Sequence, residues 1–539
     1  MTVDMLIPRP RRITAPGGTQ IPVHHGFHAP SPDPAVRALL ATFGSDLEAD
    51  GVDDIRLDAP GGLPLDVRLG PLDDGDDAPT TGLSPRDEPL DHERSALSIT
   101  ADGITITAPS REGAYRSLTT LRQIVVGSML QGRPLVLEEV EILDHPRFGW
   151  RGLSLDVVRC FFGVAEIKRV IDMLALYKMN VLHLHLTDDQ GWRIEVPTWP
   201  LLSEIGGSGA SGDRPGGCYT LAEFAEIVDY AGERFVSIVP EIDLPGHTGA
   251  AVRAYPELEG AEGGGSGPVG TMDPDAPRVR EFVTDVLATV ASVSPCPYLH
   301  IGGDEAFGVD PEAYTQFLVM ARSVVRELGK VPVTWQEGAA SSGGEGDVLQ
   351  YWMAFDPALE EVILAGDVDG VALPDGMAVP VEILTHLADA LRTGRQELIA
   401  AHGRGARILL SPASHLYLDR PYAEASVDPA QRGLRSHLGL PVYPRATVED
   451  AFTWDPAAAL PGVGDAVAGI ECAMWCETVA TAPELEFLLL PRLLGVAEHA
   501  WSSPPRTEWP GFAARVATHR RLWARRSWNS FGSELIPWV

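Results

Sequence analysis

The chain has 539 residues, 45% of them hydrophobic and 22% charged, which is typical of a globular protein with more than one domain. The 75 acidic and 42 basic residues give a formal net charge of −33. A surface this acidic repels nucleic-acid phosphates and anionic lipid headgroups, so we expect neither nucleic acid nor a membrane as a partner.

The cysteines and the distribution of apolar residues indicate a cytoplasmic protein. The five cysteines are scattered and odd in number, which predicts free thiols and no disulfide framework. The first residues lack the apolar core of a signal peptide. We also find no run of about 18 apolar residues, so no segment is expected to span a membrane.

Residues 1–145 are predicted to form a small α+β domain. Apolar and polar residues alternate over residues 96–109 around an Asp-Gly turn, which predicts two paired strands. Apolar residues then recur at helical spacing over residues 113–126. No cluster of chemically active side chains is evident here, so we expect a structural role.

Residues 146–505 are predicted to form an eight-stranded (β/α) TIM-type barrel, because strand-like and helix-like segments alternate there. The predicted strands begin at Gly152, Asn180, Ser237, Tyr298, Pro332, Val348, Arg407 and Val467. The connection over residues 354–406 is interpreted as a long structureless segment. Residues 506–539 are predicted to contain a C-terminal helix that packs on the barrel.

Polar and aromatic residues follow the predicted strands. They include Asp188, His247, Asp304, Glu305, Trp335, Glu337, Trp352, Tyr417, Asp419, Trp475 and Glu477. In a TIM barrel the carboxyl ends of all strands meet at one mouth, where the active site lies. Tryptophan next to carboxylate is typical of a carbohydrate site, because sugar rings stack on indole while their hydroxyls bind charged acceptors.

The GGDE segment at 302–305 places two carboxylates next to each other. Glycosidic cleavage needs an acid for the leaving oxygen and a group that stabilises the positive anomeric carbon. Adjacent carboxylates are poorly placed to act as acid and direct nucleophile on opposite faces of a sugar. Their closeness also drives their pKa values apart, so that one can stay protonated. The segment therefore favours a mechanism in which the substrate supplies its own nucleophile.

Nine motifs occur in order along the chain. They are HPRFGWRGLSLDVVR from His145, KMNVLHLHLTDDQGWRIE from Lys178, VPEIDLPGHT from Val239, HIGGDEAF from His300, TWQEG from Thr334, QYW from Gln350, YLD from Tyr417, MWCE from Met474 and PRLLGVAEHAWS from Pro491. With these motifs the sequence resembles glycoside hydrolase family 20, the β-N-acetylhexosaminidases, over nearly its whole length.

The resemblance implies a retaining exo-β-N-acetylhexosaminidase that removes terminal N-acetylglucosamine or N-acetylgalactosamine through an oxazolinium intermediate, with no cofactor and no metal. Glu305 would be the general acid and then the base, and Asp304 would orient the substrate acetamide. The other implied roles are acetamide binding by Tyr417; tuning of Glu305 by Asp188 and His247; an acetamide pocket of Trp335, Trp352 and Trp475; and binding of ring hydroxyls by Arg151, Asp419 and Glu477.

Some positions depart from the family pattern. Cys160 follows Arg159 where the family often has histidine, and Gln336 stands between Trp335 and Glu337 where an acidic residue is common. Together with the 354–406 connection, they leave the accepted leaving group open. The preference between glucosaminide and galactosaminide and the oligomeric state are also open, and a small oligosaccharide is the expected substrate.

Two alternatives remain at this point. A metal-dependent barrel hydrolase of the amidohydrolase type would use His183 and His185, which face the same side of one strand, with His247 and His300 as further ligands. A non-catalytic sugar-binding protein would keep the barrel without turnover. Loss of activity on chelation would indicate the first, and tight binding without product release the second.

Overall fold

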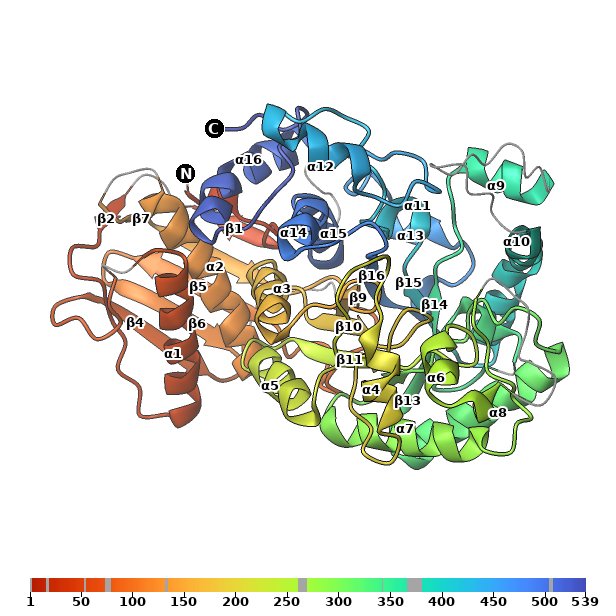
Figure 1. Cartoon of the computed structure of the whole chain (residues 1–539). Coiled ribbons are helices and arrows are strands. Elements are labelled where there is room, and N and C mark those ends of the chain that lie inside the picture. Colours follow the sequence, from red (N-terminus) through yellow and green to blue (C-terminus); the bar gives the residue numbers. More distant parts are fainter. Residues whose placement is uncertain are drawn as a thin grey trace.

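The computed structural model describes residues 2–15, 19–52, 55–72, 79–130, 134–259, 269–341, 343–365, 381–503 and 508–539. Figure 1 shows an N-terminal sheet on one side of a larger barrel, with both chain ends near the first of these units. No helix within the described ranges is long and apolar enough to cross a membrane.

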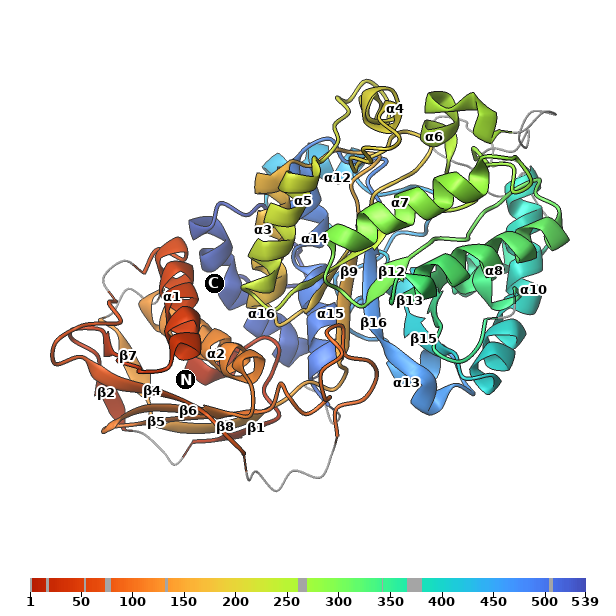
Figure 2. The ribbon, with the colours of Figure 1, turned by 90° about the horizontal axis from the view of Figure 1, so that it is seen from below.

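The N-terminal sheet has six strands in the order β1-β8-β5-β6-β4-β3. Their bounds are β1 Arg12–Thr14, β8 Val140–Asp144, β5 Ser95–Thr100, β6 Gly103–Ala108, β4 Leu63–Leu69 and β3 Phe27–His28, and β2 Gln20–Pro22 pairs separately with β7 Val136–Glu138. The predicted hairpin is confirmed as β5 and β6, which pair antiparallel. Helices α1 (Pro34–Ala49) and α2 (Arg111–Met129) cover one face of the sheet (Figure 2).

The predicted eight-stranded barrel is confirmed. The strands are β9 Trp150–Asp156, β10 Val181–His185, β11 Ser237–Glu241, β12 Tyr298–His300, β13 Val331–Trp335, β14 Val348–Tyr351, β15 Arg407–Leu410 and β16 Val467–Met474. All eight neighbours pair in parallel and β16 closes the barrel on β9. Nearly every strand residue is buried, as expected for parallel strands covered on both faces.

Helices surround the barrel between the strands. The longer ones are α3 Val164–Leu176, α5 Leu221–Gly232, α7 Val279–Val293, α8 Pro311–Glu327, α14 Ala482–Leu489 and α15 Arg492–Trp501; the short ones are α4 Leu201–Glu204, α6 Gly249–Ala254, α11 Ala413–Leu416, α12 Arg432–His437 and α13 Pro456–Ala459. The capping box of α5, in which Thr220 and Glu223 cap each other's backbone, is a local signal for its start.

The interior of the barrel changes from apolar to polar along the strands. Residues near the strand starts, among them Trp150, Val181 and Val348, form an apolar cluster. His183 and His185 follow Val181 by two and four residues on β10. Because side chains alternate along a strand, both histidines point into the same interior as Val181. Polar side chains are thus stacked beneath the mouth of the barrel.

The interpretation of residues 354–406 as structureless is wrong. This connection contains α9 (Pro357–Ala365) and α10 (Val381–Gly403), while residues 366–380 lie outside the described part. Leu384, Leu387 and Leu391 recur at helical spacing on α10 and pack against the barrel mouth. Figure 1 places α9 and α10 on the side of the barrel away from the N-terminal sheet, and Figure 2 shows the same for α10.

The predicted C-terminal helix is α16 (Trp509–Arg525). Its Trp523 indole donates to the Tyr177 hydroxyl, which follows α3 of the barrel, over 2.7 Å. The same helix contacts α2 and the short 3-10 helix η1 (Thr2–Met5), so it packs on both units.

Candidate active site

The turn after β12 holds the two adjacent carboxylates in one fixed conformation. Gly302 and Gly303 have φ values of 63° and 102°, and Glu305 itself has a φ of 47°. A Cβ on Gly302 would lie 1.6 Å from Oδ1 of Asp243, so only glycine fits there. The same Asp243 oxygen accepts a hydrogen bond from the Gly303 amide over 3.0 Å. Strain of this kind in a tightly determined turn is common at functional sites.

Asp304 and Glu305 differ in their surroundings. Asp304 is 8% exposed, and burial together with the neighbouring Asp243 raises its pKa well above the usual value. Burial also raises the pKa of Asp243, to about 7. Glu305 is more open, with 21% of its side chain exposed. Asp304 therefore gains most when a positive charge arrives beside it, while Glu305 is the more open of the two carboxyls.

His247 connects both carboxylates to Asp188. Its Nε2 lies 3.4 Å from Glu305 Oε2 and 3.6 Å from Asp304 Oδ2, and its Nδ1 lies 3.2 Å from Asp188 Oδ1. Burial lowers the pKa of His247, but Asp188, Glu305 and Asp304 raise it further, so it ends well above the ordinary value. The structure therefore brings the predicted pair Asp188 and His247 together with Asp304 and Glu305.

Asp188 is charged although it is buried. Burial raises its pKa, but the Arg159 guanidinium and His247 lower it further, to well below the usual range. Arg159 Nη2 lies 2.8 Å from Asp188 Oδ2, and the Arg159 guanidinium lies over the Trp475 ring at 5.5 Å. His185 Nε2 approaches the same Asp188 oxygen at 2.8 Å.

Acidic and imidazole groups continue in alternation into the barrel. His185 Nδ1 lies 2.6 Å from Glu241 Oε2, His183 Nε2 lies 3.1 Å from the same Glu241 oxygen, and His183 Nδ1 lies 2.9 Å from Glu471. Burial lowers the pKa values of His183 and His185, but Glu241 and the other carboxylates raise them to about 9 and about 10. Sequence reasoning recognised the histidines but missed Glu241 and Glu471, which lie on two other strands, β11 and β16.

The alternation of carboxylates and imidazoles also bears on the alternative that the protein is a metal-dependent hydrolase. Among the described residues, His183, Glu241 and His300 are one of several groups whose ligand atoms lie within 4.8 Å of one another; His185 with Glu241 and Asp243 is another. Both nitrogens of His185, however, already contact carboxylates, and His247 is paired with Asp188 nearer the mouth. The geometry therefore favours acid–imidazole pairs over a four-histidine metal centre.

Aromatic rings wall the mouth beside the carboxylates. Trp352 and Tyr417 are stacked at 6.4 Å with their planes 8° apart, and Tyr417 lies 6.1 Å from Trp475. The Trp335 indole donates to Glu241 over 2.8 Å and its ring lies 6.0 Å from Trp475. The four predicted aromatic residues are thus brought together. Such a cage excludes water and presents ring faces suited to a small amide group.

Two further carboxylates at the mouth, the buried Asp419 and the partly buried Glu477, have buried oxygens without protein donors. Both side-chain oxygens of Asp419 and the Oε2 of Glu477 have no hydrogen-bond partner among the described residues. Burial raises the pKa of Asp419 well above its usual value, and the neighbouring Glu477 raises it further. Buried polar atoms are normally paired, so an unpaired set at a mouth marks the position of a ligand's donor groups. Sugar hydroxyls are donors of this kind.

Comparison with known proteins agrees with this geometry. A family model described as glycosyl hydrolase family 20, catalytic domain, matches residues 148–375 and 387–504, and one described as domain 2 of that family matches residues 4–145. The chain belongs to glycosyl hydrolase family 20. The predicted family and the prediction of a glycoside hydrolase of the β-N-acetylhexosaminidase type are thereby confirmed.

Several relatives carry the name of a β-N-acetylhexosaminidase or a chitobiase. A β-N-acetylhexosaminidase from Cellulomonas fimi is 37% identical over 84% of this chain and 83% of its own length. N,N'-diacetylchitobiase from Vibrio harveyi is 27% identical over 94% of this chain and 63% of its own length. The structure of N-acetyl-β-hexosaminidase from Streptomyces plicatus with thio-NAglucal has a TM-score of 0.82, 32% identity and coverage of 100% and 98%.

The structure corrects one site residue of this family 20 chain. Arg151 is the second residue of β9, at the strand end opposite the mouth, and is fully buried. Its guanidinium contacts Glu93 of the N-terminal unit at 2.6 and 2.9 Å and donates to the Lys178 carbonyl. It therefore cannot bind a sugar hydroxyl. The arginine at the mouth is Arg159, beyond the other end of β9, which sequence reasoning passed over.

The departures from the family pattern have structural effects. Gln336 lies in the 3-10 helix η4 (Gln336–Ala339), and its carboxamide oxygen accepts hydrogen bonds from the amides of Trp352 and Met353 over 3.1 and 2.8 Å. It thereby holds the end of β14 in place. Cys160 is buried, which raises the pKa of its thiol to about 11. All five cysteines are free, as predicted.

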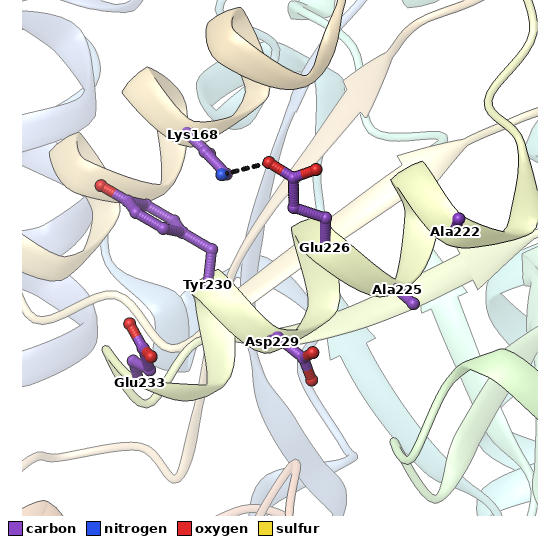
Figure 3. A pocket seen from close by; sticks show the side chains of 7 residues that line it. All are labelled: Lys168, Ala222, Ala225, Glu226, Asp229, Tyr230 and Glu233. Atoms are coloured by element: carbon purple, nitrogen blue, oxygen red, sulfur yellow. Dashed lines mark hydrogen bonds and ion pairs between the residues drawn. The ribbon is translucent and has the colours of Figure 1, made fainter.

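A second depression lies outside the mouth. It is lined by Lys168 of α3, five residues of α5 and Glu233 just after α5, and Lys168 forms an ion pair with Glu226 over 2.6 Å (Figure 3). Of the seven lining side chains that Figure 3 labels, Tyr230 is the one aromatic residue, and the carboxylate of Glu226 is paired with Lys168. The depression offers no chemistry comparable to that of the barrel mouth.

Proposed function

We propose that this chain is a retaining exo-β-N-acetylhexosaminidase that removes terminal N-acetylglucosamine or N-acetylgalactosamine with the help of the substrate's own acetamide. The observation that carries the proposal is the adjacent pair Asp304 and Glu305 beside a closed aromatic cage. In support, the S. plicatus relative has been seen with GlcNAc as product. Direct displacement by an enzyme carboxylate would need a second carboxylate about 5 Å from the acid, on the opposite face of the sugar. Two carboxylates that are adjacent in one turn are poorly placed for that arrangement.

In the first step the acetamide carbonyl oxygen attacks the anomeric carbon while the bond to the leaving oxygen breaks. Glu305 gives its proton to that oxygen, so the leaving group departs as an alcohol. The product is a cyclic oxazolinium ion, whose positive charge Asp304 stabilises from the acetamide side. Because burial makes ionised Asp304 unfavourable beforehand, the arriving charge strengthens this contact in the transition state.

In the second step Glu305, now a carboxylate, takes a proton from water as the water oxygen attacks the anomeric carbon. The carbon–oxygen bond of the oxazolinium ring breaks, and the acetamide and the original β configuration are restored. His247, protonated because of Asp188, faces Glu305 throughout and compensates its negative charge between the two steps.

The remaining mouth residues bind the sugar. Tyr417 would donate to the acetamide oxygen, and Trp335, Trp352 and Trp475 would enclose the methyl group. Asp419 and Glu477 would accept hydrogen bonds from ring hydroxyls, which fits their lack of protein donors. Arg159 takes the place first given to Arg151 in orienting this region.

The natural substrate is proposed to be a small oligosaccharide with a terminal N-acetylhexosamine. One relative in the comparison is named N,N'-diacetylchitobiase, which supports a short chitin fragment as substrate. The cytoplasmic location expected from the sequence stays a prediction, and cell fractionation tests it.

A series of aryl β-glucosaminides whose N-acetyl carries one, two or three fluorines tests the substrate-assisted step. Fluorine withdraws electrons from the attacking oxygen, so kcat is expected to fall by about tenfold or more per step of the series. An enzyme carboxylate as nucleophile would make the rate insensitive to fluorine. Detection of the α-anomer as first product by NMR would contradict retention.

A further inference from the structure

His386 of α10 lies at the rim of the active site, where the family pattern does not account for it. The catalytic-domain match is interrupted between residues 375 and 387, so His386 falls in the interruption. Its Nε2 lies 4.0 Å from Glu337 Oε1, and its ring meets Phe307 edge-on at 5.0 Å. Helix α10 thus brings one polar side chain onto the loop that carries the catalytic carboxylates.

The contacts of His386 place it near the general acid. Phe307 is two residues beyond Glu305, and its amide donates to the Glu305 carbonyl over 2.6 Å. Burial lowers the pKa of His386, but Glu337, and then Glu305, raise it further than burial lowers it. Because Glu305 protonates the leaving oxygen in the proposed mechanism, groups around Glu305 face the part of the substrate that leaves.

Helix α10 holds His386 firmly against the aromatic cage. Leu384 and Ala388 on the same helix are buried in one apolar cluster with Trp335, Trp352 and Tyr417. Glu337 is anchored as well, because its Oε2 accepts a hydrogen bond from the Trp352 indole over 3.1 Å. The position of the imidazole therefore follows from packing on both sides of it.

One edge of the His386 ring stays available. Nε2 is buried beside Glu337, yet 32% of the side chain is exposed. Within the described ranges Nδ1, at the other edge of the ring, has no hydrogen-bond partner. Unlike Nε2, it is not among the buried unpaired atoms, so it lies in the exposed part of the side chain.

We propose that His386 and Phe307 form a subsite for the leaving sugar, in which His386 Nδ1 donates a hydrogen bond to an oxygen of that sugar and Phe307 provides an apolar surface. The proposal rests on the proposed function. It assigns the start of α10 a role in specificity, favouring oligosaccharides over glycosides whose leaving group has no hydroxyls. His386 acts in binding and takes no part in proton transfer to the anomeric centre.

The test compares two substrates with the same terminal sugar, N,N'-diacetylchitobiose and p-nitrophenyl N-acetyl-β-D-glucosaminide. For His386→Ala, kcat/KM on the disaccharide is expected to fall about tenfold, the scale of one lost hydrogen bond from a charged donor. The aryl glycoside, whose leaving group offers no hydroxyl, should change by less than about twofold. His386→Gln, which keeps an N–H donor, should recover part of the loss.

His402→Ala is the matched control, because it removes a histidine from the last turn of the same helix, roughly 24 Å away along the helix axis. It should leave both substrates unaffected. An equal loss of both substrates in His386→Ala, or a loss of neither, overturns the subsite. Failure of the unaltered protein to cleave the aryl glycoside overturns the proposed function itself.

Discussion

Replacing Arg151 by methionine is expected to destabilise the protein and leave its chemistry intact. The guanidinium is fully buried, contacts both oxygens of Glu93, and donates to three backbone carbonyls. Breaking a buried ion pair from one side costs about 3–5 kcal/mol, because the remaining charge and acceptors stay buried. Glu93 keeps its contact with Arg116 at 2.9 Å, so the lower end of this range applies.

The assay pairs this variant with Arg159→Met, which removes the arginine at the mouth. Arg151→Met should lower the midpoint of thermal unfolding by about 3 °C, with kcat/KM at 25 °C within about threefold of the original. Arg159→Met should do the reverse and lower kcat/KM by about two orders of magnitude, because Asp188 and Trp475 lose their positioning contact. If Arg151→Met abolishes turnover while still folded, the placement of Arg151 away from the sugar is refuted.

Three further predictions concern the interior and the mouth. Because Glu241 raises the pKa of His183 to about 9 and of His185 to about 10, their stabilising charge is complete below pH 6.5 and is lost as pH rises through these values. Urea midpoints should therefore fall from pH 7 to pH 10, and a flat profile contradicts this. Asp419→Asn should weaken binding of N-acetylglucosamine by about 1.5–3 kcal/mol in calorimetry; unchanged binding would remove Asp419 from the sugar site. Gln336→Leu leaves two buried amides unpaired and should cost about 1–3 kcal/mol in unfolding experiments, while a neutral effect would show that β14 needs no such support.

Most of the fold could be predicted because its signals are local. Buried parallel strands are continuous apolar runs, and each run ends in polar residues that meet at the mouth. The two arginines of the β9 region show the limit of this reasoning. Arg151 and Arg159 lie eight residues apart in one motif, and only the partners brought by other segments, Glu93 and Asp188, reveal which end of the strand each one serves.

The pairs of His183 and His185 with Glu241, and helix α10, could not be predicted from the sequence for the same reason. His185 on its strand is equally suited to a metal or to a carboxylate, and Glu241 decides this from a neighbouring strand. Helix α10 carries a leucine pattern that was overlooked because the segment was interpreted as structureless, and its contact with Glu337 depends on tertiary packing.

The most direct test of the central claim is hydrolysis of a fluorogenic N-acetyl-β-D-glucosaminide by the unaltered protein, Glu305→Gln and Asp304→Ala, each with and without a chelator. The account predicts turnover by the unaltered protein that the chelator does not change, with rates at least about a hundredfold lower in both variants. Full activity in Glu305→Gln, or loss of activity on chelation, would contradict it and direct attention to His183, Glu241 and His300.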